Sequence, residues 1–196
     1  MYKYSLFWIM IETFNKYVDL KVLGFFLANP RTAMNVNELA RTLRISPTSV
    51  NQAAKFFHSK GYLSKDEKGL AHYYQLDLNN PVVTPLKKAY GLDLILTSSP
   101  MKAFLNADEN IISLALYGSF AGGDFDEDSD VDFLVVTPSK REMLMATIHE
   151  LEGKLGKEVN VTVFKPGEWR AMAKNGDAFY KNVIKQHVLL YGSGLK

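Results

Sequence analysis

The first part of the chain carries apolar residues at near-helical spacing, interrupted by residues that begin and end helices. This pattern predicts helices over residues 18–27, 35–44 and 46–60, followed by a hairpin over residues 62–76. Asn35 and Glu38 form a capping-box pair, and Ser46 precedes a proline that suits the first helical position. We therefore expect three helices, with a short helix–turn–helix, and then two antiparallel strands.

From residue 81 onward the pattern alternates between strands and helices. We expect helices over residues 84–96, 101–105, 137–152, 166–174 and 177–185. We expect strands over residues 111–117, 131–136, 159–163 and 187–191. The predicted fold class is α/β (α+β), with a small mixed sheet in the second region, and the predicted domains are residues 1–80 and 81–196.

Candidate chemistry lies where the strand over residues 111–117 ends. Gly118–Ser119 follows that strand, and Asp130–Val131–Asp132 opens the next one. Period-two alternation places both carboxylates on one strand face, roughly 7 Å apart at their Cα atoms. Such a pair suits Mg²⁺ or Mn²⁺ bound to substrate phosphates. Gly118 lets the backbone approach a ligand closely, and Ser119 offers a hydroxyl and an N–H to a phosphate.

The spacing Gly-Ser, ten residues, Asp-x-Asp resembles the signature of the minimal nucleotidyltransferases of the polymerase-beta-like superfamily. The resemblance covers roughly the C-terminal half of the chain. It implies a nucleoside triphosphate donor, ATP by analogy, with phosphates held by Gly118 and Ser119 and Mg²⁺ (or Mn²⁺) held by Asp130 and Asp132. It also implies transfer of a nucleoside monophosphate to a hydroxyl, with a docking protein such as a toxin partner as the acceptor.

Two positions depart from the pattern of that family. A third carboxylate commonly binds metal or acts as a base there, and the matching position is Asn160, whose amide cannot accept a proton. Glu158 lies on the same predicted strand face and is the other candidate, although a solvent-facing role fits it equally well. Family members often carry Arg after Gly-Ser, where this chain has Gly122–Gly123. The candidate catalytic residues are Ser119, Asp130, Asp132, Glu158 and Asn160, and Lys140, Lys154 and Lys157 are candidate replacements for the missing cation.

The acidic run between the two strands has simpler interpretations as well. From Ala103 to Ser139 there is no Lys or Arg. An EF-hand loop that began at Asp124 would require Gly at position 129 and Glu at position 135, where the chain has Ser and Val. A solvated acidic loop explains residues 124–128 without any ligand, and leaves Asp130 and Asp132 as the candidate metal pair.

The N-terminal pattern resembles a winged helix-turn-helix domain over residues 18–77. In such domains the second helix of the turn motif enters the DNA major groove. The resemblance therefore implies DNA contacts from Thr48, Ser49, Asn51, Gln52 and Lys55. Residues 34–70 hold six Lys and Arg against three acids, so one copy would bind DNA weakly and a homodimer would join two half-sites. The alternative is a winged helix used for protein docking or dimerisation.

Composition sets a few further bounds. With 196 residues, 47% hydrophobic residues and a net charge of +2, the chain is of the globular class. It has no cysteine, which excludes disulfides and thiolate metal sites and fits a cytoplasmic protein. The apolar start of the chain is interrupted at Glu12, too early for a membrane span. We expect this stretch to be a packing segment, at a dimer interface, rather than a signal peptide.

Two functions of different classes fit this sequence. The first is a Mg²⁺-dependent nucleotidyltransferase that transfers AMP, or another nucleoside monophosphate, to a protein or small-molecule hydroxyl. The second is a DNA-binding transcriptional regulator or antitoxin whose nucleotidyltransferase domain is degenerate and only binds nucleotide or a partner.

Overall fold

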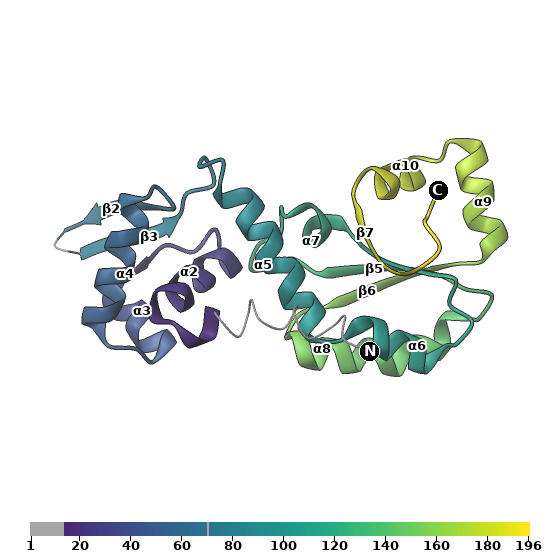
Figure 1. Cartoon of the computed structure of the whole chain (residues 1–196), viewed down its shortest axis with the longest axis horizontal. Helices are drawn as coiled ribbons and strands as arrows, with labels where there is room; N and C mark the ends of the chain where they lie inside the picture. Colours follow the sequence, from purple (N-terminus) through teal and green to yellow (C-terminus); the bar gives the residue numbers. More distant parts are fainter. Residues whose placement is uncertain (1–13, 70) are drawn as a thin grey trace. The chain divides into compact units, whose positions relative to one another are not determined.

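A computed structural model describes residues 14–69 and 71–196. The apolar stretch that was expected to act as a packing segment, residues 1–12, lies outside the described residues. The chain divides into two compact units, Met1–Asp93 and Leu94–Lys196, which Figure 1 colours from purple to teal and from teal to yellow. The boundary predicted between residues 80 and 81 remains a prediction.

The N-terminal unit combines helices with a three-stranded antiparallel sheet in the order β1-β3-β2. Its elements are α2 (Val18–Ala28), β1 (Met34–Asn35), α3 (Val36–Leu43), α4 (Pro47–Ser59), β2 (Leu63–Lys68) and β3 (Ala71–Leu76). This arrangement is the one predicted from the resemblance to a winged helix. The two-residue strand β1 was not predicted, because its pairing with β3 joins residues far apart in the sequence.

Local capping chemistry fixes the predicted helix starts. Glu38 N–H donates to Asn35 Oδ1 (3.0 Å), and Asn35 N–H donates to Glu38 Oε2 (3.3 Å), which completes the capping box. Ser49 N–H donates to Ser46 Oγ (3.1 Å) at the start of α4. The predicted hairpin is confirmed, since β2 and β3 pair antiparallel from Leu63 opposite Leu76 to Lys68 opposite Ala71.

One apolar core stabilises the N-terminal unit. Val22 and Phe26 of α2, Val50 and Ala54 of α4 and Tyr74 of β3 are buried in it. Helix α5 (Val83–Thr97) begins in this unit, and its Val83 is buried in the same core. The helix is therefore anchored at its start by packing against the winged-helix core.

The C-terminal unit is built on a four-stranded mixed sheet in the order β6-β5-β4-β7. Its strands are β4 (Ser113–Tyr117), β5 (Val131–Val136), β6 (Val159–Phe164) and β7 (His187–Gly192). Strands β5 and β6 are parallel, whereas β4 is antiparallel to both β5 and β7. The prediction of a small mixed sheet is confirmed.

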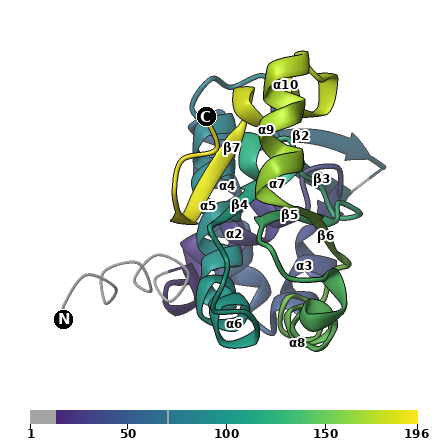
Figure 2. The same cartoon turned by 90° about the vertical axis from the view of Figure 1, so that its right-hand side faces the viewer.

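Helices cover both faces of this sheet. Helices α6 (Pro100–Ala107) and α8 (Met145–Leu155) cover one face, and α9 (Pro166–Asn175) and α10 (Ala178–Lys185) cover the other (Figures 1 and 2). The single-turn helix α7 (Gly118–Gly122) follows β4, and a 3-10 turn, η1 (Arg141–Leu144), precedes α8.

The helix predicted to begin at residue 137 begins later, at Arg141. Thr137 is fully buried, and its hydroxyl donates to the Asp108 carboxylate (2.5 Å). The Ser139 hydroxyl donates to the same carboxylate (3.0 Å). These two residues therefore bind a distant side chain instead of capping a helix, which explains why the local pattern gave the wrong start.

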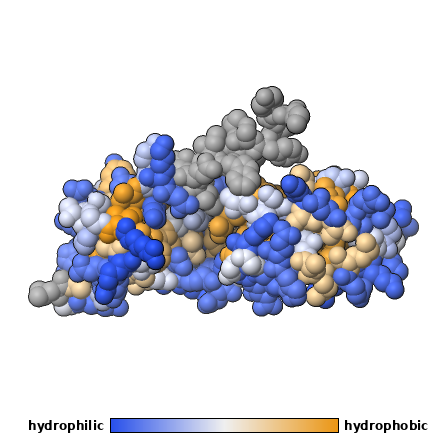
Figure 3. Space-filling view, turned by 90° about the horizontal axis from the view of Figure 1, so that it is seen from below, coloured by the Kyte–Doolittle hydropathy of each residue, from blue (hydrophilic) through white to orange (hydrophobic). Residues whose placement is uncertain are grey.

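Hydrophilic residues cover most of the surface visible in Figure 3, and hydrophobic residues form small patches among them. Within the described part of the chain, no helix has both the length and the apolar character that crossing a membrane requires.

Candidate functional site

One row of side chains crosses all four strands of the C-terminal sheet. Asp132 in β5 lies opposite Tyr117 in β4 and opposite Asn160 in β6. Tyr117 in turn lies opposite His187 in β7. Residues directly opposite one another point to the same sheet face, and the Tyr117 ring contacts Phe179 of α10 at 5.6 Å between centroids. The row therefore lies on the face covered by α9 and α10, at the edge where α7 begins.

The two predicted metal ligands meet around one amide in this row. Asn160 Nδ2 donates to Asp130 Oδ2 (3.3 Å). The same amide hydrogen-bonds Asp132 and so lowers the pKa of that carboxyl. Asp130 directly precedes β5, and both carboxylates are half-buried on one side of the sheet. The sequence argument placed them on one face, and the structure does the same.

The pKa of Asp132 reports the electrostatics of this pair. Burial raises it above its ordinary value of 3.8, and the charge of Asp130 raises it further, against the opposing effect of Asn160. Two like charges in a partly buried site repel each other when no cation is present. The pair is therefore arranged to gain from a bound cation.

Gly118 brings the turn after β4 into contact with this carboxylate. Its backbone has φ +69°, which favours glycine, and a Cβ at this position would collide with the Asp132 carboxylate. The next residue, Ser119, is half-buried, and its carbonyl accepts bonds from the N–H groups of Gly123 (2.8 Å) and Asp124 (3.0 Å). The Gly-Ser turn thus begins directly against the Asp132 carboxylate.

Tyr117 separates the carboxylates from the apolar layer under α10. Its hydroxyl lies 3.0 Å from the Thr162 hydroxyl on β6. Burial raises the pKa of Tyr117, the Thr162 bond opposes this, and the Asp132 charge adds to the rise. The phenol therefore stays protonated, and an uncharged ring lies beside the Asp132 carboxylate.

These residues fit a hard divalent ion. Asp130 and Asp132 would hold it through carboxylate oxygens, and Asn160 would offer its amide oxygen as a third donor atom only with the amide turned over, since its Nδ2 faces Asp130 in this structure. Over residues 14–69 and 71–196, no group of three His, Cys, Asp or Glu side chains is placed to hold a metal. Glu158 is exposed and directly precedes β6, next to the strand that follows Asp130, and its part in the site stays a prediction.

The remaining acidic residues shape the loop that leads to Asp130. Asp126 Oδ1 accepts bonds from Asp128 N–H (3.1 Å) and from the Ser129 hydroxyl (2.9 Å). Lys157 Nζ donates to the carbonyls of Asp126 (3.4 Å), Glu127 (2.9 Å) and Ser129 (3.2 Å). This part of the run is a hydrogen-bonded loop held by Lys157, in agreement with the simpler interpretation of these acids.

The same contacts distinguish among the lysines that could replace the missing cation. Lys157 is bound to the acidic loop, and its Nζ also lies 5.6 Å from the Phe120 ring. Lys154 forms an exposed pair with Glu150 (2.6 Å), and Lys140 is exposed in the loop after β5. The sequence pattern could not have shown which of the three lysines binds the acidic loop, because these contacts join residues far apart in the chain.

The residues predicted to contact DNA lie on α4, in the N-terminal unit. Thr48, Gln52 and Lys55 are exposed, whereas Asn51 is half-buried. Ser49 is also half-buried, and its hydroxyl lies 2.8 Å from that of Ser46, so it serves the helix cap. Sequence reasoning missed the exposed Phe56 on the same helix, whose side chain is 50% accessible.

Residues 101–191 match the family model of the nucleotidyltransferase domain. A Methanocaldococcus jannaschii protein, named as a candidate protein adenylyltransferase, is 30% identical over 96 residues, which cover 46% of this chain and 94% of that protein. The chain belongs to the nucleotidyltransferase domain family. The matched region contains both Gly118–Ser119 and Asp130–Asp132.

Solved structures give weaker similarity to this nucleotidyltransferase chain. One chain comes from a toxin–antitoxin structure with AMP-PNP, with 18% identity, a TM-score of 0.40 and coverage of 50% of this chain and 75% of the other. Another comes from a structure of a tri-AMPylated Shewanella oneidensis HEPN toxin with an MNT antitoxin, with 14% identity, a TM-score of 0.36 and coverage of 51% and 73%.

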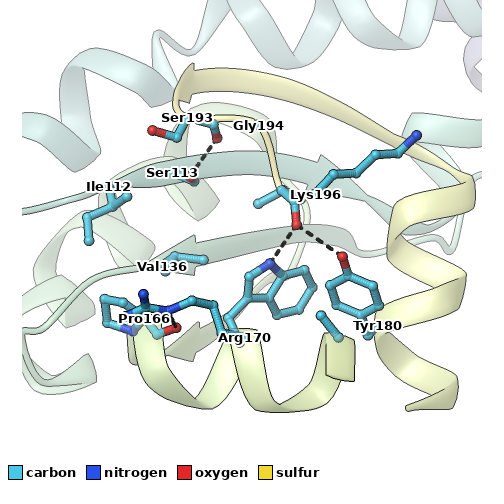
Figure 4. Close-up of a pocket in the computed structure, with 12 residues that line it drawn as sticks. Ile112, Ser113, Val136, Pro166, Arg170, Tyr180, Ser193, Gly194 and Lys196 are labelled. Carbon is cyan, nitrogen blue, oxygen red and sulfur yellow. Dashed lines mark hydrogen bonds between the residues drawn. The ribbon is translucent and has the colours of Figure 1, made fainter. Parts of the chain in front are cut away.

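A pocket of about 320 Å³ lies elsewhere in the nucleotidyltransferase domain (Figure 4). It lies where β4 begins and β5 ends, lined by Ser113 and Val136, and thus at the opposite end of these strands from Asp132. Trp169 Nε1 donates to the Leu195 carbonyl (2.9 Å) beside it. None of the predicted site residues lines this pocket.

Sequence reasoning also missed Tyr117, Thr162, Gln186 and His187, which lie at or near the carboxylate pair. The signal for Thr162 was the strand alternation, which assigns it to the same face as Asn160. Tyr117 and His187 reach the site only through strand pairing. The sequence hint for Gln186 was the pair Gly122–Gly123, because a residue without a side chain leaves space that a side chain from another element can fill.

Proposed function

We propose that this chain is a Mg²⁺-dependent adenylyltransferase that transfers AMP from ATP to a hydroxyl of a partner protein. One observation carries the proposal: Asp130 and Asp132 meet around Asn160, in contact with the Gly118 turn. A carboxylate pair beside a turn that can approach phosphates is the equipment of metal-assisted nucleotidyl transfer.

The Methanocaldococcus jannaschii relative supports the choice of a protein as the acceptor. That relative is named as a candidate protein adenylyltransferase, and the alignment covers 94% of its length. The four-stranded unit is small and has little room for an acceptor pocket of its own. An acceptor protein that docks from outside needs no such pocket. A toxin-like partner remains an expectation from the family resemblance.

Each residue of the site has a separate role in the proposed reaction. A bound Mg²⁺ would neutralise charge on the donor phosphates and polarise the α-phosphate. Asp130 and Asp132 hold the ion, and Gly118 and Ser119 position the phosphate chain. The acceptor oxygen forms a bond to the α-phosphorus as the bond to the pyrophosphate oxygen breaks. The hydroxyl proton passes to water, because Asn160 has no basic site.

Transfer is tested with ATP labelled at the α-phosphate or in the adenine, incubated with Mg²⁺ and a lysate of the source organism. We expect a labelled protein with the wild type and none with Asp130→Ala/Asp132→Ala, whose fold is checked by circular dichroism. Equal labelling by both proteins, or label released only as free AMP, would contradict the proposal.

We propose DNA binding by the N-terminal unit as a second function. The exposed Thr48, Gln52 and Lys55 on α4 support it, since they form a polar surface on the helix that enters the major groove in winged-helix proteins. We expect a gel shift at low salt that weakens in Gln52→Ala/Lys55→Ala. The lack of a shift with any DNA at low salt would contradict this second function.

A further inference from the structure

Gly122 and Gly123 are glycines for different physical reasons. Gly123 ends α7 with φ +93°, a left-handed conformation that glycine adopts readily. Gly122 lies within α7, and the structure does not place its φ in that left-handed range. A Cβ on Gly122 would collide with the side-chain amide of Gln186. The absence of a side chain at Gly122 therefore creates the space that Gln186 occupies.

Gln186 reaches this space from the junction between α10 and β7. Its backbone N–H donates to the carbonyl of Val183 (3.1 Å), which ends α10. The next residue, His187, begins β7 and lies opposite Tyr117, the residue just before Gly118. The backbone of Gln186 is thus fixed beside the start of α7, and its amide meets Gly122 at the other end of this single turn, about 6 Å away.

The Gln186 side chain therefore runs along the turn that carries Gly118 and Ser119. Its residue is exposed, so the amide borders solvent-accessible space rather than a sealed core. The Asp124 carboxylate also approaches this place, since its Oδ2 would lie 3.0 Å from a Cβ on Gly122. A cation here would be partly neutralised by that carboxylate, whereas an amide N–H keeps its ability to donate to a phosphate oxygen.

We propose that Gln186 is a donor-binding residue, whose amide N–H donates to a phosphate oxygen of the nucleoside triphosphate at the Gly118–Ser119 turn. This inference rests on the proposed function, and it assigns to α10 and β7 a contact that would otherwise come from the residues after Gly-Ser. It also gives Gly122 a defined role, which is to leave room for the amide of another element.

Binding of AMP-PNP in the presence of Mg²⁺, measured by calorimetry, tests the proposal. Gln186→Ala should weaken binding about 10-fold, because one hydrogen bond to a charged group is lost. Gln186→Glu should weaken it more, because a carboxylate repels phosphate. Gly122→Ala should also weaken binding, since its Cβ displaces the amide. In the double variant Gly122→Ala/Gln186→Ala the loss should not exceed that of Gln186→Ala alone.

Gly153→Ala is the matched control, since a Cβ there meets no atom within 4 Å, and it should bind as the wild type does. Melting temperatures should be close to that of the wild type for Gln186→Ala, and the affinity for adenosine, which lacks phosphates, should not change. Additive losses in the double variant, or an equal loss for adenosine, would overturn the assignment of Gln186.

Failure of this inference and failure of the proposed function give different results. If the wild type binds AMP-PNP and transfers AMP while Gln186→Ala does both equally well, the assignment of Gln186 is wrong and the proposed function stands. If the wild type neither binds AMP-PNP with Mg²⁺ nor transfers AMP, both are wrong.

Discussion

At the scale of single residues, Asp132 is placed to bind a metal ion, and its charge destabilises the metal-free folded protein. It is partly buried beside Asp130, and both effects raise its pKa above 3.8. The folded state therefore binds the Asp132 proton more tightly than the unfolded chain does. As a consequence, the stability of the metal-free protein falls as pH rises from the unfolded pKa through the folded one.

Asp132→Asn should remove this penalty. We expect the metal-free variant to melt above the wild type at neutral pH, and its stability to decline less as pH rises above 3.8. Mg²⁺ should raise the melting temperature of the wild type but not of the variant. Thermal scans with EDTA and with Mg²⁺ measure both effects, and a less stable metal-free variant at neutral pH would contradict this account.

Asn160 defines a second prediction at this scale. Asn160→Asp would place a basic oxygen beside Asp130 and Asp132, where the wild type has only an amide. If the acceptor is a hydroxyl, proton removal by the new carboxylate should raise kcat by about 10-fold or more. The measurement is the initial rate of AMP transfer with Mg²⁺. An unchanged rate would show that proton removal does not limit the reaction.

At the scale of elements, hydrogen bonds from distant side chains hold the segments next to the site. The acidic loop before β5 depends on Lys157, which donates to three of its carbonyls. The loop after β5 depends on Asp108, which accepts bonds from Thr137 and Ser139. Both contacts fix the ends of the strand that carries Asp132.

Lys157→Ala should loosen the loop that leads to Asp130. We expect a loss of about 1–3 kcal/mol in the free energy of unfolding, because carbonyl groups lose a charged donor, together with weaker Mg²⁺ binding. Lys154→Ala is the control, since that lysine makes only an exposed pair with Glu150 and should change stability little. Urea unfolding compares the two, and equal effects would contradict the role given to Lys157.

Thr137→Val should destabilise the other end of β5. Asp108 is 2% exposed, and losing the Thr137 donor to its carboxylate should cost about 1–3 kcal/mol in urea unfolding. Burial alone would raise the pKa of Asp108, but bonds from Thr137, Asn110 and Ser139 lower it below 3.8.

Stability from Asp108 is thus present above its unfolded pKa and is lost as pH falls through the folded one. In Thr137→Val this acid dependence should be weaker. An identical pH profile of unfolding in the wild type and the variant would argue against the proposed network.

Local signals explain which elements could be predicted. The capping pair Asn35 and Glu38 acts within one helical turn, and the strand alternation around Asp130 and Asp132 acts within one strand, so both were visible in the sequence. The row from His187 to Asn160 depends on the pairing of four strands. The late start of the helix after β5 depends on the distant Asp108. Neither of these leaves a local pattern.

At the scale of the whole molecule, the two units differ in charge. Residues 1–93 contain 12 Lys and Arg against 7 Asp and Glu, whereas residues 94–196 contain 11 against 14. Phosphate contacts make DNA binding salt-dependent, whereas a metal-bound triphosphate is held by local coordination. The two proposed functions should therefore respond differently to salt and to mutation.

We expect Gln52→Ala/Lys55→Ala to weaken DNA binding and to leave AMP transfer unchanged. The reverse is expected of Asp130→Ala/Asp132→Ala. Gel shifts over a range of KCl concentrations and transfer assays on the same preparations measure both. Loss of transfer in the α4 variant would contradict the division of functions between the units.

The central claim is that Asp130 and Asp132 hold the metal that binds the donor nucleotide. A crystal structure of the protein with Mn²⁺ and AMP-PNP, with anomalous data, tests it most directly. The account predicts an anomalous peak between these two carboxylates and phosphate oxygens of the analogue at the Gly118–Ser119 turn. An anomalous peak elsewhere, or an analogue bound away from this turn, would contradict it.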